Sequence, residues 1–379
     1  RQMQLMTDKD FRTKLNNRQV MVSQQTSNGG RQQQIWDLGR LWLKWSARRQ
    51  YDGLDFYPHH QARDYGSQRI WDTFGHWPSA SVDNNWLGDP SRRGLIQFLR
   101  ADKLAAIDSL DQAQAGCDRF LQHLKDIICG NYRPQQQQQL YHYVVMWLAS
   151  CLSHHLDRAK TALVLQGGQG SGKSTMVNLF GQLLGRHYLH LQDSGRLTER
   201  FNGYMRDILL LFSDESFWAG DIRSANTLKG MITEDSRLIE HKFQNPEVVP
   251  NFARLIFASN NDWIVSSDHD DRRFQVIEVS ESKKQDRGYF TAIRQQWADG
   301  GKECLYYYLT SDQIQQQMLD FNFEKQRVRT PLAMQQLLNS NLAAAWIQEI
   351  LDNGGTWYQE ADKAGQWKLK EWRETESNS

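Results

Sequence analysis

The pattern of apolar and polar residues changes in character near residue 160 of the chain. Before that point apolar residues recur every three or four positions, which is the spacing of an amphipathic helix. One such stripe covers residues 120–128 and stops before Gly130, where a C-terminal cap belongs. A second stripe begins after Pro134 and extends to Cys151. The pattern therefore predicts a helical subdomain over residues 101–159.

Beyond residue 160, short apolar runs alternate with helical stripes, which is typical of an α/β sheet. A helix is expected over residues 172–184, ending at Gly185. The alternation over 237–243, followed by the valines at 248–249, predicts a β-hairpin inserted before the third strand. The expected fold class is thus α/β, with a central parallel sheet and this hairpin, preceded by the helical subdomain. The expected strands cover residues 161–165, 207–212, 253–258 and 274–279.

The two ends of the chain carry weaker signals. Residues 1–100 are expected to form an irregular or linker region of unknown role, apart from a helical spacing over Leu38–Trp45. Residues 311–379 are polar and are predicted to be helical without recognisable chemistry. The run Gln135–Gln139 opens a predicted helix, and a solvated first turn explains it better than a functional polyglutamine tract.

Composition restricts the class of protein. Lys and Arg number 45 against 44 Asp and Glu, so any site for nucleic acid must be local rather than a property of the whole molecule. Four widely spaced cysteines argue against a zinc ribbon or a disulfide scaffold and fit a reducing cytoplasm. No apolar run reaches the length of a membrane span, so no membrane partner is expected. The chain does not begin with Met, and we expect it to be part of something longer.

A glycine-rich loop carries the strongest chemical signal. Residues 167–174 match G-x-x-x-x-G-K-[ST], between a predicted strand and a predicted helix. The glycines let backbone N–H groups point at phosphate oxygens, Lys173 would neutralise the β and γ phosphates, and Ser174 would ligate Mg²⁺. The expected cofactors are therefore ATP and Mg²⁺. The predicted nucleotide-binding residues are Gly167, Gly168, Gln169, Gly170, Ser171, Gly172, Lys173, Ser174 and Thr175.

Polar residues at the ends of the next two strands complete the predicted site. Asp214 would hold Mg²⁺ through water, and Glu215 would polarise the attacking water. Asn260 ends the third strand, where an amide could sense the γ-phosphate, although an isolated Asn is more often a turn residue. Arg272 and Arg273 precede the fourth strand. An arginine at this place could reach the nucleotide of a neighbouring subunit, and Arg273 is the preferred candidate over Arg272. The competing interpretation is a surface salt bridge of little energetic value.

The predicted hairpin places His241, Lys242 and Phe243 near its tip. Lys242 is suited to a nucleic-acid phosphate and Phe243 to base stacking. Taken alone, these residues slightly favour an ordinary amphipathic hairpin whose Phe243 lies in the core.

With these elements in order, the sequence resembles superfamily 3 helicases, and more closely the primase–helicases of phages, plasmids and mobile elements, including relatives of the poxvirus primase–helicase. The resemblance rests on GGQGSGKST, LLLFSDE, LKGMITEDSRLIEHKF, LIFASN and DRRF, which lie within Lys160–Ser280.

The resemblance implies an AAA+-type P-loop motor over residues 160–310, with residues 101–159 as an oligomerisation collar. It implies a homo-hexamer that hydrolyses ATP and moves along single-stranded or forked DNA in the host cytoplasm. It implies that Arg273 acts on the nucleotide of a neighbouring subunit and that the hairpin projects into the ring channel. The hairpin position favours DNA contact by Lys242, with His241 in support. Lys229, which lies in the same LKGMITEDSRLIEHKF stretch, is a further candidate. Such chains often carry a primase or polymerase module ahead of the motor, and this sequence shows no primase active site of its own.

Two other classes share the phosphate loop. A non-motor P-loop ATPase, acting as a switch or scaffold in defence or assembly, needs no basic channel tip. A small-molecule kinase would need a lid and an acceptor pocket instead of a hairpin and a trans arginine. Stimulation of ATP hydrolysis by single-stranded DNA separates a motor from the other two.

Overall fold

The structure is a computed structural model, and it falls into two compact units, residues 1–57, 62–73 and 77–83, and the remainder. Among the described residues, no helix is both long and apolar enough to cross a bilayer. The residues that the structure describes are 8–25, 31–45, 53–55, 70–72, 95, 98–152, 159–192, 194–214, 222–242, 245–260, 272–332, 355–359 and 367–371.

The first unit contains regular structure where the sequence predicts an irregular region. Helix α1 (Asp8–Leu15) precedes an antiparallel pair, β1 (Gln19–Gln25) and β2 (Arg31–Asp37), and β3 (Gly53–Asp55) pairs in parallel with β4 (Ile70–Asp72). The expectation of irregular structure is wrong for α1, β1 and β2. In β1 and β2, glutamines occupy strand positions that usually carry β-branched residues. The short strands β3 and β4 lie within residues 51–90, where the sequence predicts irregular loops with short strands. The helix expected near Leu38 is present as α2 (Leu38–Lys44), with the Asp37 carboxylate accepting from the Arg40 N–H at 2.6 Å.

The second unit begins with the predicted helices. The first are α3 (Ala101–Ala105), α4 (Leu110–Gly116) and α5 (Asp118–His123), which continues as a π-helical turn over Leu124–Ile128. The longest is α6 (Pro134–Leu152), whose residues from Tyr143 to Leu152 are all buried. This burial explains why α6 is apolar nearly all round in its second half.

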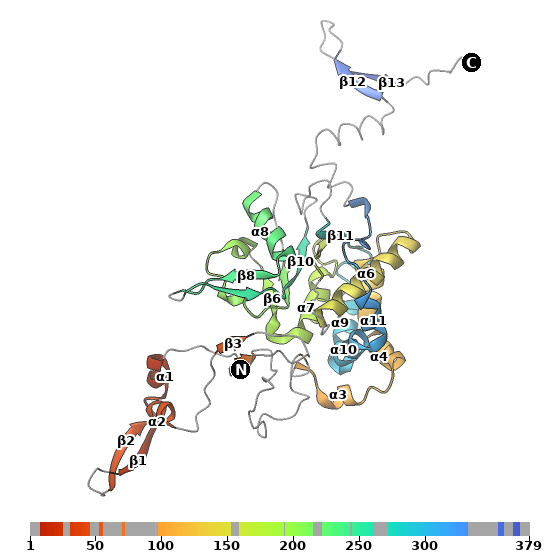
Figure 1. Ribbon diagram of the computed structural model, residues 1–379. Coiled ribbons are helices and arrows are strands. Elements are labelled where there is room, and N and C mark those ends of the chain that lie inside the picture. Colours follow the sequence, from red (N-terminus) through yellow and green to blue (C-terminus); the bar gives the residue numbers. More distant parts are fainter. Residues whose placement is uncertain are drawn as a thin grey trace. The chain divides into compact units, whose positions relative to one another are not determined.

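A five-stranded parallel sheet forms the centre of this unit, which confirms the α/β class (Figure 1). The strand order is β11-β5-β10-β7-β6, and the sequence predicts all of them except β6. Strand β6 is short and mostly half-buried at the sheet edge, so it lacks the continuous apolar run of a central strand. The five strands are β5 (Ala162–Gln166), β6 (Tyr188–Leu191), β7 (Leu210–Ser213), β10 (Arg254–Ser259) and β11 (Phe274–Glu278).

Two elements around β10 matter for the site. Helix α7 (Lys173–Leu184) follows β5, and α8 (Ile222–Thr233) precedes the expected hairpin of β8 (Ser236–Ile239) and β9 (Glu247–Pro250). Only three residues separate β9 from β10, so the hairpin is joined closely to a central strand of the sheet (Figure 1).

The chain after β11 forms α9 (Arg287–Gln296), a π-helical turn over Trp297–Gly301, α10 (Lys302–Thr310) and α11 (Asp312–Leu319). The following segment lies along the exposed edge of β11, where the Gln275 side chain bonds both the N–H and the carbonyl of Val328 at 2.8 and 2.9 Å. Near the C-terminus, β12 (Gly355–Gln359) and β13 (Trp367–Glu371) form an antiparallel pair, so the helical prediction for 311–379 is wrong there.

Candidate functional site

The phosphate loop connects β5 to α7 in the expected way. Gly170 and Gly172 have φ of +80° and +104°, a backbone region in which only glycine is free of strain. A Cβ on Gly172 would also lie 2.5 Å from Cε1 of His123, so the glycine is required by both conformation and space. The Gly167 N–H donates to the Ser259 carbonyl at 3.2 Å, which fixes the start of the loop against β10. The glycine spacing in the sequence thus encodes the local backbone of the loop.

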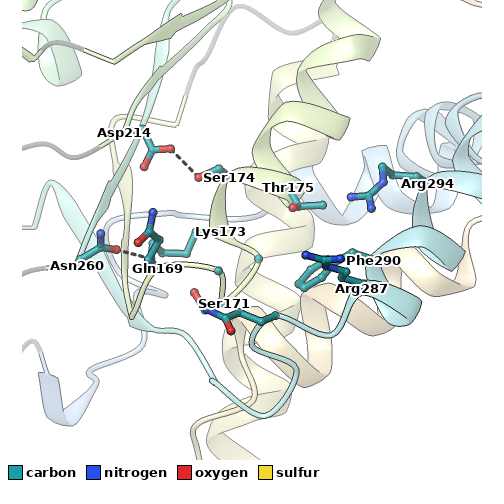
Figure 2. A pocket seen from close by; sticks show the side chains of 13 residues that line it. Gln169, Ser171, Lys173, Ser174, Thr175, Asp214, Asn260, Arg287, Phe290 and Arg294 are labelled. Atoms are coloured by element: carbon teal, nitrogen blue, oxygen red, sulfur yellow. Dashed lines mark hydrogen bonds between the residues drawn. The ribbon is translucent and has the colours of Figure 1, made fainter.

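Lys173 lies at the centre of the site and is almost fully buried. Its Nζ donates to the carbonyls of Gly167 and Gly168, the latter at 3.0 Å, and to Oδ1 of Asn260 at 3.0 Å (Figure 2). Burial lowers the pKa of Lys173, and the carboxylates of Asp214 and Glu281 oppose that shift. The structure therefore brings together the predicted loop lysine and the amide at the end of β10.

Ser174 and Asp214 form the second predicted pair. The Ser174 hydroxyl donates to Oδ2 of Asp214 at 2.6 Å, immediately after the end of β7 (Figure 2). A hydroxyl and a carboxylate oxygen are ligands that suit Mg²⁺, so these residues fit the expected ion. Glu215, the predicted water activator, lies outside the described residues.

A pocket of about 720 Å³ opens over the loop, a volume within the range of small-ligand sites. The predicted residues from Gln169 to Thr175, together with Asp214 and Asn260, line one part of it. Arg287, Phe290 and Arg294 of α9 line another part, on the opposite side of the start of α7 in Figure 2.

Sequence reasoning missed these three residues of α9. Their spacing of three and four positions puts them on one face of a helix, which is the signal that could have found them. The two guanidinium groups give the pocket a second source of positive charge, and arginine suits phosphate oxygens.

The loop is also held from behind by α5 and by the segment before α9. The imidazole of His123 donates from Nε2 to the Gly172 carbonyl at 3.2 Å and accepts at Nδ1 from the Tyr289 hydroxyl at 3.1 Å. The Gly168 N–H donates to the Glu281 carboxylate at 2.9 Å, and the Gln285 N–H donates to the Gly170 carbonyl at 3.2 Å. The loop conformation therefore depends on residues that lie far from it in sequence.

Two buried imidazoles predict an acid-sensitive fold. Burial lowers the pKa of His123 and of His187 to about 4, from an ordinary value of 6.5. Between these pH values the unfolded chain binds protons that the folded chain does not, so stability falls as the pH drops from 6.5 towards 4. Each ring is expected to cost up to about 3 kcal/mol over that window.

Urea unfolding at pH 7 and pH 5 measures this loss. His187 donates from Nδ1 to the Asp207 carbonyl at 2.7 Å, and His187→Asn keeps a donor there without a titrating ring. This variant should lose less stability than the parent between the two pH values. An equal loss in both proteins would contradict the assignment to His187.

The two arginines before β11 lie away from the pocket. The Ala162 N–H donates to the Arg273 carbonyl at 2.7 Å, so Arg273 sits at the beginning of β5, whereas the phosphate loop follows its end. A strand of this length separates the two by roughly 16 Å at about 3.3 Å per residue. Arg272 forms an ion pair with Glu324 at 3.3 Å. Neither arginine lines the pocket of its own chain.

The hairpin tip contacts an exposed aromatic ring that the sequence analysis missed. Nζ of Lys242 lies 5.5 Å from the ring centroid of Phe201, and Cζ of Arg200 lies 5.8 Å from it. Phe201 is 43% exposed, which is unusual for a large apolar side chain. A basic residue next to an aromatic one in the stretch TERF was the available signal. His241 lies 3.6 Å from the Glu247 carboxylate, at the end of the strands next to the hairpin turn.

Two further residues, Lys229 and Phe243, are predicted to contact DNA. Lys229 is half-buried on α8, and Phe243 lies outside the described residues. Whether Phe243 contacts DNA or lies in the core therefore stays a prediction.

Hydrogen bonds join the loop that carries Phe201 to the hairpin. The Asn202 amide donates to the Leu238 carbonyl at 3.0 Å and accepts from the Glu240 N–H at 2.8 Å. The Arg237 guanidinium donates to the carbonyls of Met205 and Arg206, and its burial lowers its pKa to about 10. These contacts hold Phe201 and Lys242 on one rigid surface.

Comparison with known proteins finds a match over the segment that carries the phosphate loop and the following strands. A family model described as a family of unknown function (DUF5906) matches residues 165–273, which include the phosphate loop, Asp214, Asn260 and Arg273. The DNA primase-polymerase of Nitratiruptor phage NrS-1 is 28% identical over 157 residues. This chain is similar to a phage primase–polymerase. The match covers 40% of this chain and 21% of the relative, so it spans about a fifth of that protein.

Solved structures extend the similarity in fold. Two apo structures of the NrS-1 C-terminal region each give a TM-score of 0.58 at 18% identity, covering 91% of this chain and 80% or 79% of theirs. At this identity the likeness shows a shared fold.

Proposed function

We propose that this chain is an ATP-driven motor that moves along single-stranded DNA as a ring of identical subunits, in the replication of a phage or mobile element. One observation carries the proposal. Lys173 of the phosphate loop donates a hydrogen bond to Asn260, which follows the last residue of β10. The hairpin of β8 and β9, which carries Lys242, is joined to the first residue of the same strand. A change at the nucleotide could therefore reach the basic tip through Asn260, β10 and β9.

The chain's own residues supply the chemistry of this proposed site. The glycine N–H groups and Lys173 bind the phosphates, and Ser174 with Asp214 would hold Mg²⁺, which neutralises phosphate charge when bound. Arg287 and Arg294 add cations from the same chain. Glu215 would accept the proton of the attacking water, and Asn260 would sense the γ-phosphate.

An AAA+-type arrangement in a hexameric ring completes the proposal. Arg273 precedes β11 and lies at the end of β5 remote from the loop. Its distance from its own pocket supports a role at a neighbouring subunit's nucleotide. The similarity to a phage protein named for DNA synthesis supports DNA as the strand and the host cytoplasm as the compartment. The alternative is a non-motor ATPase switch, which shares the phosphate loop and needs no response to DNA.

ATP hydrolysis measured with and without single-stranded DNA tests the proposal. A motor should be stimulated by the strand and should displace the complementary strand of a forked duplex. Equal hydrolysis rates with and without DNA, in protein that forms rings, would support the switch instead.

The hairpin surface gives a more specific prediction. Lys242→Ala and Phe201→Ala should each keep the basal ATPase rate and lose most of the stimulation by DNA. The reason is that stacking of a base on an aromatic ring is worth about 1–3 kcal/mol and that Lys242 would neutralise a phosphate, whereas neither residue lines the nucleotide pocket. Phe201→Trp serves as the matched control and should retain stimulation. Full unwinding by Lys242→Ala would rule out this surface as the DNA contact.

A further inference from the structure

A second positively charged groove, distant in sequence from the phosphate loop, lies between the start of α6 and the segment that covers the edge of β11. Its volume is about 730 Å³. Arg133, Arg327 and Arg329 line it together with glutamines from the first turns of α6, and none of its described lining residues is a carboxylate. Because the whole chain is close to neutral, three arginines among the described residues that line one groove form a local excess of positive charge.

Two of these arginines have no competing partner among the residues that the structure describes. Within the described part of the chain, Arg133 and Arg329 make no side-chain hydrogen bond or ion pair, and both are exposed. Arg327 donates from Nη1 to the Phe274 carbonyl at 3.2 Å, which fixes its guanidinium at the groove wall. The charges of Arg133 and Arg329 therefore lie exposed at the groove, beside the guanidinium of Arg327.

The backbone that carries the arginines is rigid. Val328 bonds the Gln275 side chain through both its N–H and its carbonyl, and the Thr330 hydroxyl donates to the Val276 carbonyl at 2.9 Å. The Gln136 amide donates to the Arg329 carbonyl at 2.8 Å, which ties the two walls together. A preorganised site loses less entropy when it binds.

The remaining lining groups suit bases more than a single anion. The amides of Gln135 and Gln139 each offer donors and an acceptor at the groove. The rings of His142 and Phe321 pack edge to face with centroids 5.5 Å apart, and both line the groove. Cations, amides and exposed ring surface together are the groups that recognise single-stranded nucleic acid.

We propose that this groove binds single-stranded nucleic acid, with the arginines on phosphates and with the glutamines and the His142–Phe321 pair on bases. The proposal deepens the proposed function, because it gives the strand a second contact on the subunit. The chain segment that carries Arg327 and Arg329 also contacts the DRRF motif, because Glu324 forms an ion pair with Arg272. The glutamine run that opens α6 then has a role, since three of its residues line the groove.

Binding of a labelled oligothymidylate without ATP tests the groove. Arg133→Ala/Arg329→Ala should weaken binding by about tenfold or more, and should reduce the slope of log K against log salt by about 1.4 for two lost phosphate contacts. Lys125→Ala/Lys325→Ala removes two exposed cations of the same neighbourhood that do not line the groove, and should change the affinity by less than about twofold. Unchanged affinity and slope in the arginine double variant would overturn the proposal.

Further measurements distinguish strand binding by the groove from the proposed motor function and from a site that binds one small anion. If only the Lys242 and Phe201 variants weaken DNA binding, the groove assignment fails and the motor stands. If the groove variant weakens DNA binding while the parent ATPase ignores DNA, the groove stands and the motor fails. A parent that binds no oligothymidylate at low salt overturns both. Displacement of the oligomer by millimolar inorganic phosphate, but not by matched chloride, would show a site for one anion and overturn strand binding.

Discussion

Arg273→Ala is expected to reduce ATP hydrolysis by about 10³-fold or more while leaving nucleotide binding unchanged. The guanidinium of a trans arginine stabilises charge that develops on the transferred phosphoryl group, so its loss acts on the turnover rate. Arg273 begins the strand beside β5 at the end away from the phosphate loop, and it does not line the pocket of its own chain. Steady-state hydrolysis and binding of a fluorescent ATP analogue measure the two quantities separately.

Mixing two inactive variants gives this prediction its control. A subunit with Arg273→Ala keeps its phosphate loop, and one with Lys173→Ala keeps its arginine. If the arginine acts between neighbours, mixed rings contain some intact sites and regain part of the parent rate. Hydrolysis by Arg273→Ala at the parent rate, or a mixture that stays inactive although the subunits co-assemble, would contradict the trans role.

The second large effect is expected from Lys173→Ala. The Nζ group lies among the carbonyls of Gly167 and Gly168 and beside Asn260, so the loop is built around its charge. Removing one cation aimed at the reacting phosphates should lower the hydrolysis rate by about 10²–10³-fold. ATPase assays at saturating ATP measure this loss.

Exposed Lys125 provides the matched control for the lysine, because Lys125→Ala removes the same charge outside the pocket. That variant should hydrolyse ATP at the parent rate. Thermal unfolding of both variants checks that the fold is intact. A Lys173→Ala protein that is folded and hydrolyses ATP normally would remove the phosphate loop from the mechanism.

The Arg287 and Arg294 pair shows why part of the site escapes sequence reasoning. The phosphate loop and these arginines are separated by more than a hundred residues, and α9 meets the loop only because β11 lies beside β5 in the sheet. No local spacing encodes that strand order. Phe201 and Lys242 are a similar case, since Asn202 bonds the hairpin backbone to bring them together.

The misses in secondary structure have a different cause. Strand β6 is short and half-buried at the edge of the sheet, and β1 and β2 contain many glutamines, so none of them shows the apolar run or clean alternation that predicts a strand. The hydrogen bonds of a ladder do not depend on side chains, and pairing with a neighbour can form such strands against weak propensity.

The sequence by itself determined the phosphate loop, the polar ends of β7 and β10, and four of the five strands of the central sheet. These features are local, because a positive φ demands glycine and a buried strand demands a continuous apolar run. Only the tertiary structure decided which distant side chains share a pocket, a hairpin surface or a groove. That choice depends on strand order in the sheet and on packing between segments far apart in sequence, and no short stretch of residues contains that information.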